Sequence, residues 1–163
     1  MADICVVVAD GARARLFIVD TSEADKARLV EMEDLVNTEY RARGADVLPK
    51  VRSTRNTGRQ SGPVHPYAQR RLRHRLELEK RFAQDVAGKV AGLTQSWGHG
   101  SVILIAEPRM LGLLREAGRG VPKHGVTTKE LAKDYTQLTV SELHQHLAES
   151  GIMGSPAARP AQS

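Results

Sequence analysis

A short, uninterrupted run of apolar residues near the start of the chain limits the fold more than any other feature. Residues 4–9 (ICVVVA) are continuous and rich in β-branched side chains, a pattern typical of a buried strand. An Asp-Gly turn signal follows, and residues 15–19 predict a second strand. The two strands would form a hairpin whose turn carries Arg13. A third strand is predicted at residues 28–35.

The second half of the chain alternates helix and strand patterns. Leu72, Leu76, Val86 and Val90 recur near a three-to-four-residue spacing, which predicts a long helix over residues 66–93 with one apolar stripe. The elements predicted after it are a buried strand at 102–106, a helix at 109–115, a short strand ending near 133, and a helix from the capping-box sequence at 139–142 to about 149.

Together these elements predict a single α/β domain with a central mixed β-sheet flanked by helices. At 163 residues, the chain is long enough for one sizeable core and too short for two ordinary domains. The domain is expected to cover residues 1–150. Residues 37–65 lack periodicity and predict a long basic loop inside it, and residues 151–163 predict a disordered tail.

The positive charge is concentrated in one part of the sequence. Residues 41–81 hold 12 of the 24 Lys and Arg but 3 of the 19 Asp and Glu, a local balance of +9, whereas the remainder has a balance of −4. Such asymmetry indicates a polyanionic partner for the basic segment. The start of the predicted long helix carries four of these arginines, where cations oppose the helix macrodipole. A solvated basic face is the alternative, and a binding role is favoured over it.

Cysteine and histidine usage argues against several kinds of site. The single cysteine, Cys5, excludes a disulfide framework and a Cys-rich zinc site, and its apolar surroundings predict a buried thiol. His144 and His146 are two residues apart on a predicted helix, so their rings would point to different faces, and no metal site is predicted.

No segment is a signal peptide or a membrane span, so the sequence predicts a cytoplasmic protein without a membrane partner. No cofactor is predicted.

Two further sites have a structural and a functional interpretation. The sequence Glu107-Pro108-Arg109 follows a strand and begins a helix, a position where Arg109 could help bind an anion; alternatively, Glu107 and Arg109 pair locally and fix the loop. Asp10 and Asp134 both follow predicted strands and could form a carboxylate pair, but turn formation explains Asp10 without any chemistry. A small-molecule ligand is therefore not expected.

Three stretches, in this order, resemble the bacterial host-attachment protein family. They are residues 8–17 (VADGARARLF), 106–115 (AEPRMLGLLR) and 132–138 (AKDYTQL), and the resemblance spans about residues 3–149. It implies kinship with the middle domain of eukaryotic and archaeal peptide-chain release factors, in which a long loop carries a Gly-Gly-Gln motif. Here that place reads Gly58-Arg59-Gln60, so the resemblance implies peptidyl-tRNA ester hydrolysis by Gln60 as the catalytic residue. Arg59 replaces the more permissive glycine, which favours binding without hydrolysis.

The resulting hypothesis is an RNA- or ribosome-associated binding factor, whose arginines contact phosphates and whose Tyr67 stacks on a base. The alternative is a protein-interaction factor that takes part in attachment to host cells or surfaces, without catalysis. A small-molecule enzyme that uses the strand end near Arg109 has the least support. The residues predicted to bind nucleic acid are Arg52, Arg55, Arg59, Tyr67, Arg70, Arg71, Arg73 and Arg75.

Overall fold

The computed structural model describes residues 3–21, 27–40, 66–119 and 125–152, and contains the predicted elements in the predicted order. Residues 38–40 form a helical turn. The strands are β1 (Asp3–Ala9), β2 (Arg13–Asp20), β3 (Arg28–Val36), β4 (Gly100–Ile105) and β5 (Val126–Leu131). The helices are α2 (Pro66–Thr94), α3 (Pro108–Ala117) and α4 (Val140–Glu149).

The strands form one mixed sheet in the order β3-β2-β1-β4-β5. Strand β1 is antiparallel to β2 and parallel to β4, and β4 is parallel to β5. The mixed sheet and its flanking helices confirm the predicted α/β class. The carboxyl ends of β1, β4 and β5 consequently meet at one edge of the sheet, where ligands of open α/β sheets commonly bind.

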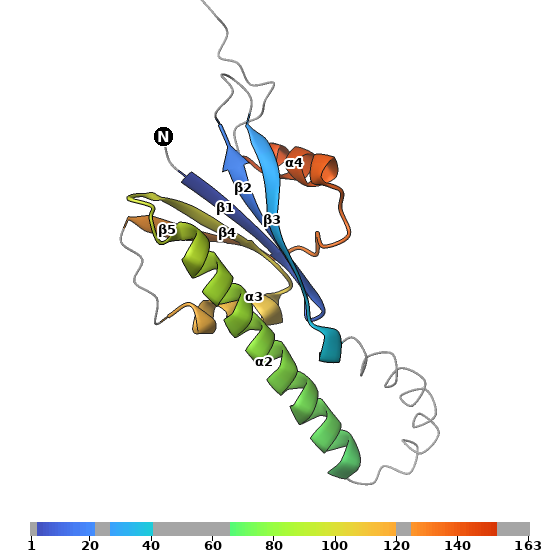
Figure 1. Ribbon diagram of the computed structural model, residues 1–163. Coiled ribbons are helices and arrows are strands. Elements are labelled where there is room, and N and C mark those ends of the chain that lie inside the picture. The colour runs from blue at the N-terminus through green and yellow to red at the C-terminus, as the bar shows by residue number, and fades with distance from the viewer. Residues whose placement is uncertain (1–2, 22–26, 41–65, 120–124, 153–163) are drawn as a thin grey trace, which may run out of the picture.

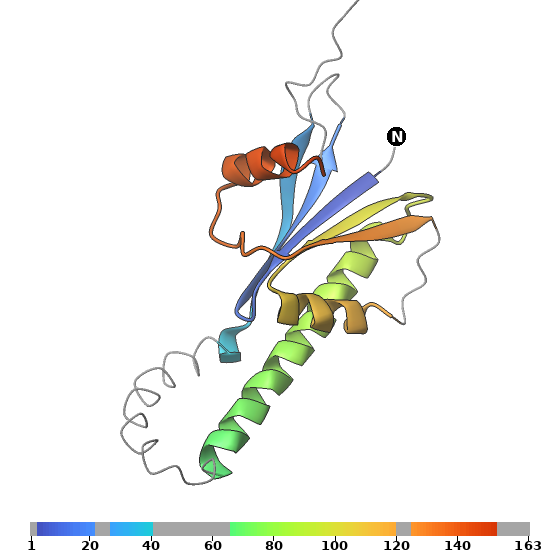
Figure 2. The same ribbon diagram turned by 180° about the vertical axis from the view of Figure 1, so that it is seen from behind.

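Helices cover both faces of the sheet (Figures 1 and 2), with α2 and α3 on one face and α4 on the other. The apolar run of β1 lies between them and alternates its side chains: Cys5 and Val7 pack toward α2 and α3, whereas Val6 and Val8 pack toward α4. This two-sided burial explains why the run contains no polar residue. Burial also raises the pKa of the Cys5 thiol to about 12, so the thiol is neutral at physiological pH.

The β1–β2 hairpin differs from its prediction at one residue. Arg13 is the first residue of β2, paired with Val36 of β3, and does not lie in the turn. The turn is closed by Asp10, whose Oδ1 accepts hydrogen bonds from the backbone N–H groups of Ala12 and Arg13, both at 2.7 Å. The predicted strand near residue 133 is also too long, because β5 ends at Leu131 and the chain then turns.

The apolar stripe of α2 begins later than predicted. Leu72 and Leu76 are 54% and 38% exposed, whereas Leu78, Phe82 and Val86 are buried. The first turns of α2 project past the edge of the sheet (Figure 1), so they lie beyond the core that the described residues form. The prediction of a stripe through Leu72 and Leu76 was wrong because spacing alone does not tell where the sheet ends.

The capping box of α4 is confirmed. The Thr139 side chain accepts a hydrogen bond from the Glu142 backbone N–H at 3.1 Å, and the Glu142 carboxylate accepts one from the Thr139 N–H at 3.0 Å. Within the described ranges, no helix combines the length and apolarity that a membrane crossing requires.

Candidate nucleic-acid interface

The start of α2 is an exposed, basic stretch of helix that projects from the body of the domain (Figures 1 and 2). Its first turn holds no acidic residue, and the first one along the helix is Glu77. Arg70 and Arg73 are exposed, and neither has a hydrogen bond or ion pair with another residue that the structure describes. Each exposed cation here opposes the helix macrodipole at a cost of about 0.3–1 kcal/mol. Two exposed guanidinium groups on a protruding helix therefore have no partner among the residues with described positions.

An aromatic ring lies beside these arginines. The Arg71 guanidinium carbon is 4.4 Å from the centroid of the Tyr67 ring, the geometry of a cation–π contact. The Tyr67 side chain is 55% exposed at the tip of the helix. A ring and arginine planes at one exposed place are the groups that stack on unpaired bases.

Arg75 is engaged within the fold, unlike its neighbours. Its Nε and Nη2 donate hydrogen bonds to the Tyr40 hydroxyl at 3.0 and 2.7 Å, and its Nε lies 3.9 Å from Oε1 of Glu79. Burial raises the pKa of Tyr40, while the hydrogen bond from Arg75 acts in the opposite direction. Arg75 therefore ties the basic helix to the segment after β3.

A buried carboxylate lies one turn further along α2. The Glu79 side chain is 1% exposed, and its Oε1 accepts a hydrogen bond from Nη2 of Arg109 at 2.5 Å. Its Oε2 has no hydrogen-bond partner among the described residues. A bond with Arg109 is the arrangement that a buried charge requires, because an unpaired charge away from water is strongly unfavourable.

The interpretation that Arg109 pairs locally with Glu107 was wrong. Glu107 is the N-cap residue of α3 but its side chain makes no capping hydrogen bond, and Arg109 pairs with Glu79 from α2 instead. Sequence reasoning missed Glu79 because it lies among charged residues. Its spacing from Phe82, Ala83 and Val86 is the signal that could have placed it on the buried stripe.

Asp10 and Asp134 are brought together around one threonine. The Thr136 hydroxyl lies 2.7 Å from Oδ1 of Asp134 and 3.3 Å from Oδ2 of Asp10. Because Asp10 also closes the β1–β2 turn, this arrangement holds the chain after β5 against that turn. Among the residues with described positions, no three His, Cys, Asp or Glu side chains are grouped so that they could hold a metal ion.

The structure brings together five of the predicted nucleic-acid-binding residues, all on the first turns of α2: Tyr67, Arg70, Arg71, Arg73 and Arg75. Four other predicted site residues lie outside the described residues: Arg52, Arg55, Arg59 and Gln60. The basic interface is therefore defined here by its helical part, residues 66–75, and is called the arginine helix start below.

Solved structures with a similar chain include a phosphatase. The chain is similar to the Ppx/GppA phosphatase of Aquifex aeolicus, in its type II variant, with 10% sequence identity and a TM-score of 0.35. The similarity covers 80% of this chain and 36% of that chain, so the chain spans about a third of the phosphatase's length. No curated protein matches the chain.

Comparison with protein families gives a nearly complete match. The family described as protein required for attachment to host cells matches residues 5–147, from within β1 to the last turns of α4. This confirms the family that the three sequence stretches resemble, while the kinship with release-factor middle domains stays a prediction. Since the match covers most of the chain and reaches every strand and helix of the fold, the chain belongs to the host-attachment protein family.

Proposed function

We propose that this host-attachment family protein binds RNA through the arginine helix start. The proposal rests on one observation: exposed arginines are gathered on a protruding helix N-terminus, where they lower the stability of the helix. A polyanion would relieve that repulsion and release its own counterions on binding.

The surroundings of the arginine helix start support this role. Arg75, Tyr40, Glu79 and Arg109 join the helix to the rest of the domain, so Arg70 and Arg73 are presented from a fixed base. Preorganised contacts lose less conformational entropy on binding. One guanidinium group can donate two parallel hydrogen bonds to the oxygens of a phosphate, and the Tyr67 ring adds a surface for base stacking.

A second function, docking of a protein partner, is favoured by the apolar residues on the same segment. Leu72 and Leu76 are exposed and one turn apart, so they lie on one side of the helix. A helix that presents both leucines and arginines has the composition of a protein-binding surface. This reading agrees with the family's part in attachment to host cells.

Fluorescence anisotropy with a labelled single-stranded RNA tests the first function and separates it from the second. The variant Arg70→Gln/Arg73→Gln should bind the RNA about tenfold more weakly than the wild type. The slope of log affinity against log salt should also be smaller in magnitude by about 1.4. The control Arg28→Gln/Arg119→Gln makes the same charge change at exposed positions away from the helix start, and should bind like the wild type. Leu72→Ser/Leu76→Ser should also leave RNA affinity unchanged.

The result that would overturn RNA binding is equal affinity in the wild type and the helix-start variant at low salt. Loss of RNA affinity in the leucine variant alone would also contradict the proposal, because binding would then depend on the apolar side chains and not on the arginines. Hydrolysis is a separate proposal that depends on Gln60. It predicts release of the peptide from peptidyl-tRNA by the wild type and none by Gln60→Ala, with RNA binding unchanged.

A further inference from the structure

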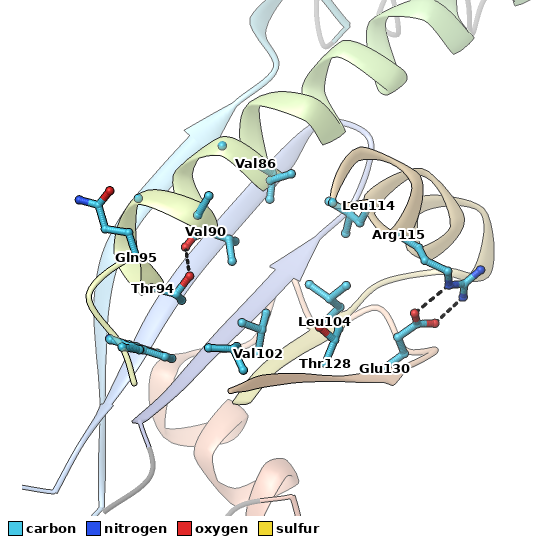
Figure 3. Close-up of a pocket in the computed structure, with 17 residues that line it drawn as sticks. Val86, Val90, Thr94, Gln95, Val102, Leu104, Leu114, Arg115, Thr128 and Glu130 are labelled. Atoms are coloured by element: carbon cyan, nitrogen blue, oxygen red, sulfur yellow. Dashed lines mark hydrogen bonds and ion pairs between the residues drawn. The ribbon is translucent and has the colours of Figure 1, made fainter. Parts of the chain in front are cut away.

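The opposite half of α2 borders a cavity that the RNA-binding proposal does not use. The cavity has a volume of about 660 Å³ and lies between the C-terminal half of α2 and helix α3, above strands β4 and β5 (Figure 3). It is called the interhelix cavity below. Binding sites for small molecules typically occupy about 300–1,000 Å³, so its size is that of a ligand site.

The cavity exists because the two helices separate and the side chains between them are small. Glu79 and Arg109 hold α2 and α3 together at one end. Further along α2, four of the residues that border the space have a small side chain or none: Ala87, Gly88, Ala91 and Gly92. A Cβ atom added at either glycine would meet no atom within 4 Å. Because these side chains are small, the space between α2 and α3 stays open and can take an occupant.

The walls of the interhelix cavity are mostly apolar. Val102 and Leu104 form the floor of the cavity. Val86 and Val90 of α2 face Leu114 of α3 across the cavity (Figure 3). Trp97 also lines the space. An aliphatic lining with one indole ring binds hydrocarbon or aromatic surface and gives a charged group no counterion.

Three polar side chains at the cavity, those of Thr94, Arg115 and Glu130, are hydrogen-bonded within the protein. The Thr94 hydroxyl donates a hydrogen bond to the Val90 carbonyl at 2.9 Å. Arg115 donates two hydrogen bonds to the Glu130 carboxylate, at 2.9 and 2.5 Å, which also raise the pKa of Arg115. Because Arg115 and Glu130 pair with each other at the rim (Figure 3), the described residues that line the cavity present no net charge to a ligand.

We propose that the interhelix cavity binds a neutral, predominantly apolar small molecule. The inference is independent of RNA binding, since the cavity borders the C-terminal half of α2 and the arginine helix start is at its N-terminus. It departs from the sequence-based expectation, which does not include a small-molecule ligand. Periodicity gives the apolar face of each helix but not the angle at which two helices separate.

The position of the chain's single tryptophan makes the proposal directly measurable. The neutral probe N-phenyl-1-naphthylamine should bind the purified full chain with saturation at one probe per chain and quench Trp97 emission by energy transfer. Ala91→Leu fills the cavity and should weaken binding about tenfold or more. Gln84→Leu adds the same side chain at an exposed position of α2 outside the cavity, and should bind the probe like the wild type.

Two further measurements fix the class of occupant. Decanol should displace the probe at concentrations at which decanoate does not, because the carboxylate has no counterion in the cavity. Thermal unfolding checks that both leucine variants are folded, and the probe should raise the melting temperature of the wild type and of Gln84→Leu only.

Three results would overturn the proposal. The first is no saturable quenching of Trp97, and the second is equal probe binding by Ala91→Leu and the wild type. The third is preferential displacement by decanoate. If the wild type shows no probe binding but sediments as a dimer that Ala91→Leu dissociates, the cavity is a contact between copies of this chain.

Discussion

Nη2 of Arg109 donates a hydrogen bond to Oε1 of Glu79 at 2.5 Å, which joins the first turn of α3 to the middle of α2. The bond lies between the two regions to which functions are proposed. Toward the N-terminus of α2 is the arginine helix start, and toward its C-terminus is the interhelix cavity. The pair therefore fixes the position of α2 for both.

The first prediction concerns this pair. Arg109→Gln should lower the free energy of unfolding by about 2 kcal/mol, because it leaves the buried Glu79 carboxylate with a weaker donor. The loss stays below that of a fully buried pair since the Arg109 side chain is 59% exposed. Urea unfolding of Arg109→Gln, Glu79→Gln and the double variant measures the coupling. Additive losses in the double variant would contradict a direct interaction.

The sheet was predictable because its strands carry strong local signals. The run at residues 4–9 lies at the centre of the sheet and is buried from Cys5 to Ala9 between the helices on both faces, which requires apolar side chains. Arg13 was misplaced because the turn requires only Asp10 and Gly11, and nothing in the pattern tells where the strand after a turn begins. Similarly, spacing predicted α2 but not where the sheet stops covering it, so Leu72 and Leu76 were assigned to the core.

The second prediction concerns Arg15, a buried arginine on β2. Its Nε donates to Glu31 at 2.6 Å and its Nη1 to the Leu138 carbonyl at 2.6 Å, while its guanidinium carbon lies 5.0 Å from the Phe17 ring centroid. Lysine cannot reproduce this fork of donors, so Arg15→Lys should lower the free energy of unfolding by about 2 kcal/mol.

Hydrogen exchange gives a second measure of Arg15→Lys. Because the Leu138 carbonyl directly precedes α4, the amides of that helix should exchange faster in the variant than in the wild type. Arg28→Lys, at an exposed position of β3, is the matched control and should change stability by less than about 0.5 kcal/mol. Unchanged protection of α4 in Arg15→Lys would show that this bond does not hold the helix.

The third prediction is a pH dependence at the start of α4. Hydrogen bonds from the backbone and side chain of Thr139 lower the pKa of Glu142 from its ordinary value of 4.5. A carboxyl group with a lowered pKa stabilises the fold above its unfolded pKa, and this contribution is lost as the pH falls through the folded value. The stability advantage of the wild type over Glu142→Gln should therefore shrink as the pH falls below about 4.5.

Chemical unfolding at a series of pH values checks this prediction, and a difference that does not vary with pH would contradict it. Thr139→Ala supplies a second variant of the same cap. This variant removes the hydroxyl that accepts a hydrogen bond from the Glu142 N–H, and it should lower the free energy of unfolding by about 1 kcal/mol.

The candidate site was only partly predictable. Composition revealed the arginines at 70, 71, 73 and 75 because charge is counted directly from the sequence. It could not separate Arg75 from the others, since its bonds to Tyr40 depend on how the chain after β3 returns toward α2. The interhelix cavity left no sequence signal, because it depends on the separation of α2 and α3 and on small residues that also occur in ordinary helices.

The central claim is that the arginine helix start binds RNA, and the most direct test is co-sedimentation with ribosomes and with tRNA over a salt series. The account predicts that wild-type binding weakens as salt rises. It also predicts that Arg70→Gln/Arg73→Gln fails to co-sediment at salt concentrations at which the Arg28→Gln/Arg119→Gln control still does. Absence of wild-type binding at low salt, or equal binding by the two double variants, would contradict the claim and leave protein docking at Leu72 and Leu76 as the function of this helix.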